Sequence, residues 1–321
     1  MRWIVTGSQG QLGRCMGRVL DGYPQEDLVG HFSHSELDLS RQESVYSALQ
    51  EESVATADFL VNCAAFTDVD GCETNEEAAR AANADGPAWL AMWCREQGIR
   101  LIHISTDYVF AGDAGRPYKE SDPVDPRTAY GRTKEEGERR VLASDPEALV
   151  VRTSWVFGPG QNFVEAIVRQ AELRKQGEAS GPLRVVSDQW GSPTYASDLA
   201  EGIVDLVLGQ EARTSAEFVG LDSASRGVNP GPPSGILHLS NAGETSWFEF
   251  AREILDLSGH AEIEVLPVSS EEFKRPAPRP AWSVLDCGRA ESLGVRLRAW
   301  PEALRDYLDL RMAGEFDGVN S

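Results

Sequence analysis

The sequence has 321 residues and a net charge of −21, from 30 basic and 51 acidic side chains. This length predicts about two domains, and the acidic balance argues against a nucleic acid or an anionic membrane as partner. No apolar run approaches the ~18 residues of a membrane span. Residues 1–3 run directly into a strand pattern without the apolar core of a signal peptide, so we expect a cytoplasmic soluble protein.

The five cysteines have neither a CxxC motif nor the paired spacing of a metal site. Cysteines in this pattern are typical of reduced, structural thiols. We therefore expect no disulfide framework and no cysteine-bound metal.

The chain begins with a strand, a glycine-rich turn and a helix. Residues 2–6 are apolar, Gly7, Gly10 and Gly13 form a GxxGxxG turn, and a helical pattern runs to Leu20. In this context the glycines let the backbone approach a dinucleotide pyrophosphate, and the helix N-terminus offers free N–H groups to it. The pattern predicts a dinucleotide-binding site.

The end of the second predicted strand, 27–32, bears on the choice of cofactor. An acidic residue there would accept from the adenosine 2′-hydroxyl and repel a 2′-phosphate. This chain has Ser33-His34-Ser35 instead. These residues are compatible with NADPH, but there is no arginine to bind the 2′-phosphate, so NADH stays possible. Ordinary polar loop residues would give the same pattern.

Further strands are predicted at 58–62, 101–105 and 149–153, with a long amphipathic helix over 75–97 and a strand-to-turn region at 185–194. Strands alternating with helices over the first ~150 residues predict an α/β fold with a doubly wound, Rossmann-like parallel sheet. The small residues of 63–65 leave room for a ligand at the strand ends. The alternation of side chains along the strand places His103 inside the sheet. There, a hydrogen-bonded core histidine is a simpler interpretation than a catalytic one.

The pattern changes beyond residue 155. We predict helices over 162–174, 197–208, 247–257 and 300–312, and a strand over 236–240. Ser246 and Glu249 form a capping box at the start of the third of these helices. The dinucleotide-binding domain would comprise 1–155 and about 196–210, and a smaller C-terminal α/β substrate domain would comprise 156–195 and 236–313. Residues 210–235 read as a mobile loop, and 314–321 as a frayed end.

Candidate catalytic residues follow the fourth strand. Ser105 and Thr106 end it, and alternation places them on opposite faces, so only one can act in catalysis. Tyr130 and Lys134 are four residues apart in a predicted helix and therefore share one face. A phenol beside an ammonium is easier to ionise, which would make Tyr130 a proton donor or acceptor usable near neutral pH.

Taken together, these motifs resemble those of the dTDP-4-dehydrorhamnose reductase family, within the extended short-chain dehydrogenase/reductase superfamily. No single stretch is specific to that family, but the combination is, and it spans nearly the whole chain in order. The matching stretches are TGSQGQLG (6–13), NCAAFTDVDGCE (62–73), HISTDYVFAG (103–112), PYKESDPVDPRTAYGRTKEEGE (117–138), RTSWVFGPGQNF (152–163), SDQWGSPTYASDLA (187–200), LHLSNAGETSWFEFA (237–251) and RPAWSVLD (279–286).

The resemblance implies a role for each matching position. It implies a catalytic set of Thr106, Tyr130 and Lys134. It implies cofactor binding by Gly7, Gly10, Gln11, Leu12, Gly13, Asp38, Leu39, Ala64, Ala65, Thr67, Tyr130 and Lys134. It implies substrate binding by Thr106, Asp107, Tyr130 and Trp155, with Asn162, Phe163 and Gln189 as weaker candidates. For Trp155, the residues alone favour a core position after a strand.

The sequence departs from the family in two places. Some members are dimers bridged by magnesium through carboxylates, but Arg14 and Cys15 follow the third glycine here, and Ser197 stands where the second acid is expected, with Asp198 one place off. We therefore expect no magnesium and a monomer or weak homodimer. Trp282 replaces the asparagine of the family's RPxNSxL motif, a change that could reshape the sugar pocket.

The implied function is the NADPH-dependent reduction of the C4 keto group of dTDP-4-dehydro-6-deoxy-L-mannose to dTDP-L-rhamnose. Two alternatives stay open. One is a 4-ketoreductase for another nucleotide-deoxysugar. The other is a non-catalytic NAD(P)-binding regulatory subunit, against which the intact Thr106, Tyr130 and Lys134 argue. A 4,6-dehydratase would need a second acid after Asp107, where Tyr108 stands.

Overall fold

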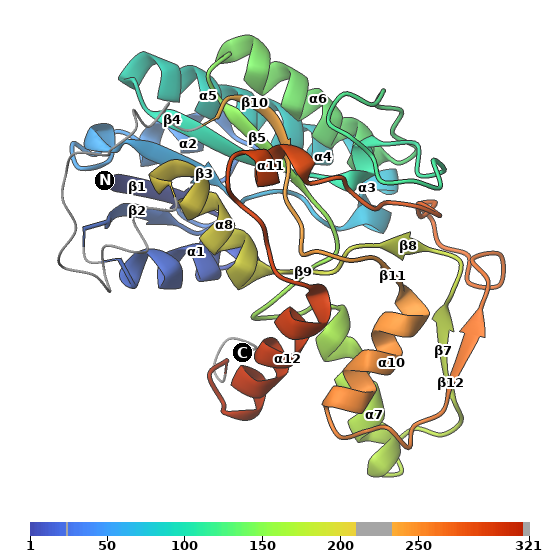
Figure 1. The fold of residues 1–321 in the computed structure, drawn as a ribbon. Helices are drawn as coiled ribbons and strands as arrows, with labels where there is room; N and C mark the ends of the chain where they lie inside the picture. Colours follow the sequence, from blue (N-terminus) through green and yellow to red (C-terminus); the bar gives the residue numbers. More distant parts are fainter. Residues whose placement is uncertain (24, 210–232, 317–321) are drawn as a thin grey trace.

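A six-stranded parallel sheet forms the centre of the molecule (Figure 1). The computed structural model describes residues 1–23, 25–209 and 233–316. Along the sheet the strands are β10 (Gly235–His238), β5 (Leu149–Thr153), β4 (Arg100–Thr106), β3 (Phe59–Asn62), β1 (Arg2–Thr6) and β2 (Asp27–Phe32). From β1 the chain goes to β2 on one side and then to β3 on the other side. In open α/β sheets, ligands bind at the carboxyl ends of the two strands between which the order reverses, here β1 and β3.

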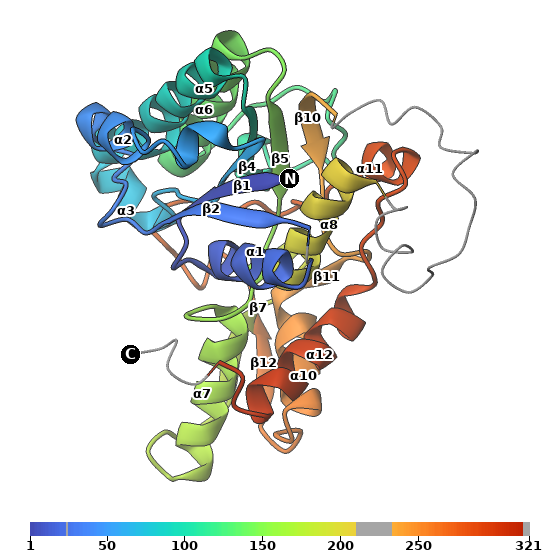
Figure 2. The ribbon, with the colours of Figure 1, turned by 90° about the vertical axis from the view of Figure 1, so that its left-hand side faces the viewer.

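Helices cover both faces of the sheet, as the doubly wound prediction requires (Figure 2). One face packs against α1 (Gln11–Asp21), α8 (Ala196–Leu208) and α11 (Gly288–Ser292). The other packs against α2 (Gln42–Ala48), α5 (Gly86–Gln97) and α6 (Ala129–Ser144). The strands have apolar side chains on both faces because both are buried. Among the described residues, no helix combines the length and apolarity needed to cross a membrane.

A second hydrophobic core lies beyond the carboxyl ends of the strands, in the lower part of Figure 1. Its helices are α7 (Phe163–Lys175), α10 (Trp247–Leu257) and α12 (Trp300–Met312). Its short strands form three pairs, β7 (Leu183–Val186) with β12 (Val265–Val268), β8 (Trp190–Gly191) with β11 (Thr245–Ser246), and β6 (Val156–Phe157) with β9 (Thr194–Tyr195). This smaller α/β region packs next to the six-stranded sheet.

Several predicted elements have the observed bounds. The strands at 2–6, 27–32 and 149–153 and the helices at 247–257 and 300–312 agree to the residue. The capping box of Ser246 and Glu249 is confirmed. Strand β10 lies in the range that the sequence analysis assigned to the substrate domain, but it pairs with β5 in the large sheet. The predicted mobile loop falls mostly on 210–232, and the frayed end partly on 317–321, outside the described residues.

The predicted helix over 75–97 corresponds to an unbroken helical stretch from Glu76 to Gln97, but this stretch is not one regular α-helix. The structure has α3 (Val69–Thr74), α4 (Glu76–Arg80), a π-helical segment at Ala81–Asp85 and then α5. Pro87, near the start of α5, has no N–H to donate to the Asn83 carbonyl, and its ring would clash with that carbonyl in an ideal α-helix. A wider turn relieves the clash, and π-bulges of this kind are frequent at functional sites.

A buried ion pair attaches α6 to the sheet. Arg152 on β5 donates from Nε and Nη2 to the two carboxylate oxygens of Glu138, at 2.8 and 2.6 Å. Ser105 donates to the same carboxylate at 2.5 Å. The side chains of Arg152 and Glu138 are 2% and 4% exposed, so water does little to compensate either charge.

Replacing Arg152 with leucine should lower the free energy of unfolding by about 3–5 kcal/mol, because Glu138 would stay buried without its partner. Urea unfolding of the purified variant measures this. The control is Arg184→Leu, which breaks an exposed pair with Glu272 and should change stability little. Equal effects of the two variants would show that the buried pair does not stabilise the α6 contact.

Candidate active site

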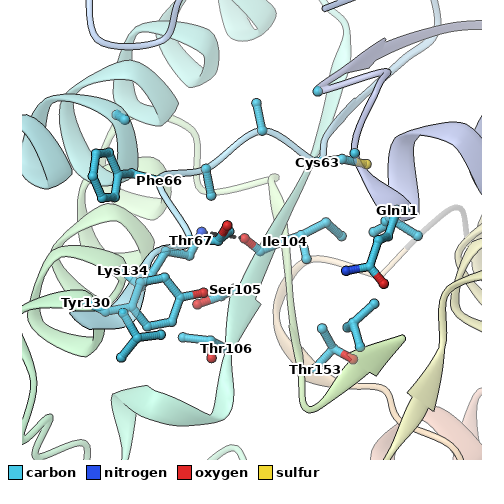
Figure 3. A pocket seen from close by; sticks show the side chains of 18 of the residues that line it. Gln11, Cys63, Phe66, Thr67, Ile104, Ser105, Thr106, Tyr130, Lys134 and Thr153 are labelled. Carbon is cyan, nitrogen blue, oxygen red and sulfur yellow. Dashed lines mark hydrogen bonds between the residues drawn. The ribbon is translucent and has the colours of Figure 1, made fainter. Parts of the chain in front are cut away.

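A cavity of about 960 Å³ opens at the carboxyl ends of the strands and is closed on one side by the second core (Figure 3). Most of the predicted site residues line it, although they come from distant parts of the chain. The predicted residues in its wall are Gly7, Gly10, Gln11, Leu12, Asp38, Leu39, Ala64, Ala65, Thr67, Thr106, Asp107, Tyr130, Lys134 and Trp155.

The glycine turn forms one end of this cavity. Gly7 has φ +69°, and a side chain there would meet the Ala64 backbone nitrogen at 2.7 Å. Gly13 does not line the cavity. A Cβ at this position would lie 2.2 Å from the Gly7 carbonyl oxygen, so the lack of a side chain lets α1 pack against the turn. Gly10 caps α1 without a side-chain hydrogen bond. The first turn of α1 is therefore open to an anion.

Asp38 lines the cavity, together with His34. Its carboxylate accepts hydrogen bonds from the Ser40 backbone N–H at 2.9 Å and from the Ser40 hydroxyl at 2.7 Å. These bonds hold the carboxylate in place at the edge of the cavity. His34 is exposed and belongs to the Ser33-His34-Ser35 segment at the end of β2.

Tyr130 and Lys134 share the buried face of α6, whose first turn is capped by the Thr128 hydroxyl accepting from the Gly131 N–H at 3.0 Å. The Thr106 hydroxyl is near enough to the Tyr130 phenol to lower its pKa. The Lys134 ammonium group donates to the Ile104 carbonyl at 2.6 Å. The structure thus brings the three predicted catalytic side chains into one corner of the cavity (Figure 3).

The expected ease of ionisation of Tyr130 is not found in this structure. Desolvation raises the pKa of Tyr130 above its ordinary value, and the hydrogen bond from Thr106 lowers it only in part. Desolvation also lowers the pKa of Lys134 to about 8, although the negative charge of Glu138 raises it. Burial therefore favours the neutral form of both groups, and the phenol keeps its proton at neutral pH.

Ser105 and Thr106 occupy opposite faces of β4, as strand alternation predicted. The Ser105 hydroxyl donates to Glu138 behind the sheet edge. The Thr106 hydroxyl donates to Asp107 Oδ1 at 2.9 Å and accepts from the Tyr108 N–H at 3.3 Å. Thr106 is therefore the one of the two that contacts Tyr130.

Asp107 is 3% exposed and lies between Thr106 and the second core. Burial raises its pKa to about 6, although hydrogen bonds from Ser283, Thr106 and two backbone N–H groups lower it. A buried carboxyl group beside Thr106 and Tyr130 can hold a hydroxyl group of a ligand as an acceptor or, when protonated, as a donor.

Trp155 has φ +47°, the one left-handed backbone among the described residues other than glycine. Its ring stacks on Trp247 with centroids 3.5 Å apart, and a Cβ on Gly191 would approach its indole to 2.3 Å. Strained backbone of this kind concentrates at functional sites. Trp155 thus lines the cavity and also packs against the second core. Its neighbour Trp247, the first residue of α10, was missed from the sequence.

The weaker substrate candidates lie outside the cavity wall. Asn162 caps α7, and its amide donates to the Gly158 and Gly160 carbonyls. Phe163 packs against Trp247, with ring centroids 4.5 Å apart. Gln189 donates to the Ser270 hydroxyl at 2.8 Å. Each of these side chains thus has a packing or hydrogen-bonding partner in the second core.

Trp282 also lies outside the cavity wall. Its ring stacks on Trp190 with centroids 6.1 Å apart, and its backbone N–H donates to the Gly112 carbonyl at 2.8 Å. Any effect of Trp282 on the sugar pocket therefore has to pass through its neighbours, among them Ser283.

The residues considered for magnesium have other partners. Arg14 donates to the Gln9 carbonyl at 2.7 Å. The carboxylate of Asp198 pairs with Arg298 at 2.9 Å and accepts from Asn241 at 2.7 Å. Within the described part of the chain, no group of three or more potential ligand side chains gathers at one point. The absence of magnesium stays a prediction.

Comparisons with known proteins decide the family. The family model described as the RmlD substrate binding domain matches residues 1–312. The chain is 40% identical, over 98% of its length and 97% of the relative's, to a probable dTDP-4,6-dihydroxy-2-methyloxan-3-one 4-ketoreductase of Streptomyces antibioticus. It is 39% identical to the dTDP-4-dehydrorhamnose reductase of Mycobacterium tuberculosis, covering 96% and 92% of the two chains. The chain belongs to the dTDP-4-dehydrorhamnose reductase family.

A solved structure of the same family agrees with this assignment. The dTDP-4-dehydrorhamnose reductase of Bacillus anthracis in complex with NADP has a TM-score of 0.79 and 32% identity, over 96% of this chain and 98% of that one. The resemblance inferred from the motifs and the Rossmann-like fold are therefore both confirmed. The family's relatives differ in the sugar that their names specify.

Replacing Asp107 with asparagine should change how stability depends on pH. The pKa of Asp107 is about 6 in the folded protein and 3.8 when unperturbed, so its stabilising contribution is present below pH 4 and is lost as pH rises through 6. The variant should therefore gain about 3 kcal/mol relative to the wild type between pH 4 and 7, from roughly two pH units at 1.36 kcal/mol each.

Urea unfolding at a series of pH values measures this difference. The control is Asp122→Asn, because hydrogen bonding to Arg116 lowers the pKa of Asp122 to about 2. Its stability contribution changes below pH 4, so its difference from the wild type should stay nearly constant between pH 4 and 7. A stability difference between Asp107→Asn and the wild type that stays constant from pH 4 to 7 would contradict the raised pKa.

Proposed function

We propose that this protein reduces the C4 keto group of dTDP-4-dehydro-6-deoxy-L-mannose to give dTDP-L-rhamnose, with NADPH as the hydride donor. The observation that carries the proposal is the meeting of Thr106, Tyr130 and Lys134 in the cavity that begins at the glycine turn. Membership of the family supports a nucleotide-sugar reductase.

The residues present fit a dinucleotide. Gly7 lets the turn pack against the Cys63 and Ala64 backbone, where a Cβ would clash, and the first turn of α1 is not capped by a side chain. Gly10, Gln11 and Leu12 would hold the pyrophosphate, and Asp38 and Leu39 the adenosine half. The nicotinamide half would lie along Ala64, Ala65, Thr67 and Lys134. The bound cofactor supplies the hydride.

In this proposal, the protein's own side chains donate the proton and orient the sugar. Tyr130 keeps its proton at neutral pH and can give it to the C4 oxygen as negative charge develops there. Thr106 lies within hydrogen-bonding distance of Tyr130 and would position the same oxygen. Asp107 would hold a sugar hydroxyl, and the stacked pair of Trp155 and Trp247 would form the apolar wall that excludes water.

Tyr130→Phe should reduce turnover by ~10²–10⁴, the usual contribution of a general acid. The measurement is NADPH oxidation with dTDP-4-dehydro-6-deoxy-L-mannose, and NMR of the product gives its stereochemistry. Tyr46→Phe, which changes a tyrosine outside the cavity, is the control. Near-wild-type turnover in Tyr130→Phe would exclude Tyr130 as the proton donor.

A different sugar is the second candidate, and one observation favours it. A relative at 40% identity is named as a 4-ketoreductase for another dTDP-deoxysugar, and Trp282 departs from the family motif. Oxidation of NADPH with several 4-keto sugar nucleotides but not with the L-manno substrate would identify this alternative. No oxidation with any of them, together with binding to a partner enzyme, would instead favour a regulatory subunit.

We expect a preference for NADPH over NADH, because no carboxylate from Ser33-His34-Ser35 would repel a 2′-phosphate. His34 is exposed and lines the cavity at this end. His34→Asp should raise the KM for NADPH about tenfold, since two charges ~4 Å apart near a surface repel by 1–4 kcal/mol, and should leave the KM for NADH nearly unchanged.

The control for this variant is His34→Asn, which is similar in size and adds no charge. Steady-state kinetics with both cofactors gives the comparison. If His34→Asp and His34→Asn had equal KM values for NADPH, the 2′-phosphate would not lie beside this residue.

A further inference from the structure

Trp155 combines two unfavourable features at the wall of the cavity. Its backbone is left-handed, with φ +47°, a conformation in which the side chain crowds the following carbonyl oxygen. Its ring stacks on that of Trp247 with centroids 3.5 Å apart and an angle of only 5° between the planes. Aromatic rings prefer an offset or edge-to-face arrangement over such a face-to-face stack. The surrounding residues therefore impose this position on Trp155.

The second core encloses the indole of Trp155 with two groups from one strand pair. Strands β8 and β11 pair antiparallel beside the start of α10, with Gly191 opposite Thr245 (Figure 1). A Cβ at Gly191 would approach the indole to 2.3 Å, so this position has no room for a side chain. Trp247 begins α10 directly after β11 and stacks on the same indole. The β8–β11 pair thus fixes both of the groups that enclose Trp155.

Trp247 is itself held in place. The capping box of Ser246 and Glu249 fixes the first turn of α10, which Trp247 begins. The rings of Phe163 and Phe250 lie 4.5 and 6.3 Å from the Trp247 ring, measured between centroids. A ring packed among such neighbours does not move aside without opening a void, so it forms a rigid support.

The backbone contact of Trp155 does not by itself determine where its ring lies. The Trp155 carbonyl accepts from the Thr194 N–H at 3.2 Å. This bond attaches the chain to β9, but it leaves the rotation of the side chain undetermined. The position of the indole therefore depends on Trp247 and Gly191.

The supported indole lies directly beside the catalytic corner. Thr153 at the end of β5 pairs with Thr106 of β4, and Trp155 follows two residues after Thr153. Trp155 lines the same cavity as Thr106 and Tyr130. A ligand held at Thr106 and Tyr130 thus borders on Trp155.

We propose that Trp247 is a positioning residue, which holds Trp155 in its left-handed conformation and so fixes the wall of the cavity that faces the sugar. A wall formed before binding reduces the free energy lost when the sugar is ordered. The support acts on the ground state and the transition state alike, so its loss should raise KM and leave kcat nearly unchanged. The sugar in this proposal rests on the proposed function, whereas the support of Trp155 by Trp247 does not.

The first test is circular dichroism of the protein without cofactor or sugar. Two stacked indoles couple their transitions and give paired bands of opposite sign. We expect Trp247→Phe and Trp155→Phe to lose these bands, and Trp89→Phe, on the far face of the sheet, to keep them. The neighbouring indoles of Trp190 and Trp282 contribute equally to every spectrum and cancel in the differences. Difference spectra without paired bands would overturn the proposal.

The second test is a double-mutant cycle measured by urea unfolding. Gly191→Ala places a methyl group against the indole of Trp155, and the indole cannot move aside while Trp247 supports it. In the Trp247→Leu background it can, so Gly191→Ala should cost about tenfold less in the unfolding equilibrium constant. The matched control is the pair Gly191→Ala and Trp89→Leu, whose effects should add. Additive effects in the Trp247 cycle as well would overturn the proposal.

The third test uses the reductase assay. Trp247→Leu should raise the KM for the sugar nucleotide about tenfold, with kcat and the KM for NADPH nearly unchanged. Trp247→Phe keeps a flat ring and should restore most of the affinity. A fall in kcat at constant KM, or equal KM values for the two variants, would contradict a positioning role.

The outcomes separate this proposal from the function. The first two tests need neither cofactor nor sugar, so a failed reductase assay would leave them unaffected. Additive effects in the Trp247 cycle would overturn the proposal even if the protein reduces its sugar. If Trp247→Leu does not fold, Trp247→Met, which keeps more of the apolar volume on a flexible side chain, replaces it in the cycle and in the assay.

Discussion

The close approach of α6 to its neighbours is the constraint on which the site depends. A Cβ at Gly131 would lie 2.2 Å from the Tyr108 carbonyl oxygen, and one at Gly137 would lie 2.1 Å from the Asn83 carbonyl oxygen. Larger residues would push the helix away from β4. With glycine at both positions, Tyr130 and Lys134 reach the strand end, and Glu138, one turn further along, reaches Arg152 and Ser105.

Burial then decides the charge states in this corner. Desolvation raises the pKa of Tyr130 and of Asp107 and lowers that of Lys134, so all three shifts favour the neutral form. At neutral pH only Tyr130 is held neutral, because the pKa of Asp107 is about 6 and that of Lys134 about 8. Glu138 and Arg152 form a separate ion pair behind the strand. A site of this kind suits a reaction that consumes a proton, because its acid stays protonated at neutral pH and its fixed dipoles need little reorganisation.

The wall that would face the sugar has a different origin from the wall that would face the cofactor. Trp155 follows β5 of the large sheet, but its stacking partner Trp247 begins α10 of the second core, and Gly191 of β8 makes room for the pair. The distance between the two cores therefore sets the width of the sugar side.

The sequence by itself determined the order of strands and helices, the glycine turn, the parallel sheet and the corner formed by Thr106, Tyr130 and Lys134. These follow from local rules: strand alternation separates Ser105 from Thr106, a four-residue spacing places Tyr130 beside Lys134, and a capping box starts the helix at Trp247. The π-helical segment before Pro87 was missed because it depends on one missing N–H inside an otherwise helical pattern.

Only the tertiary structure decided which tryptophans face the cavity and which polar groups are charged. Trp155 and Trp247 are 92 positions apart, a separation that no periodic pattern connects, and Asn162 and Gln189 found partners in the second core. For the same reason, the pKa of Tyr130 is raised, whereas its spacing from Lys134 had predicted easier ionisation. The charge of a side chain depends on the water it loses and the partners it gains, and both are set by residues that are distant in sequence and meet only when the chain folds.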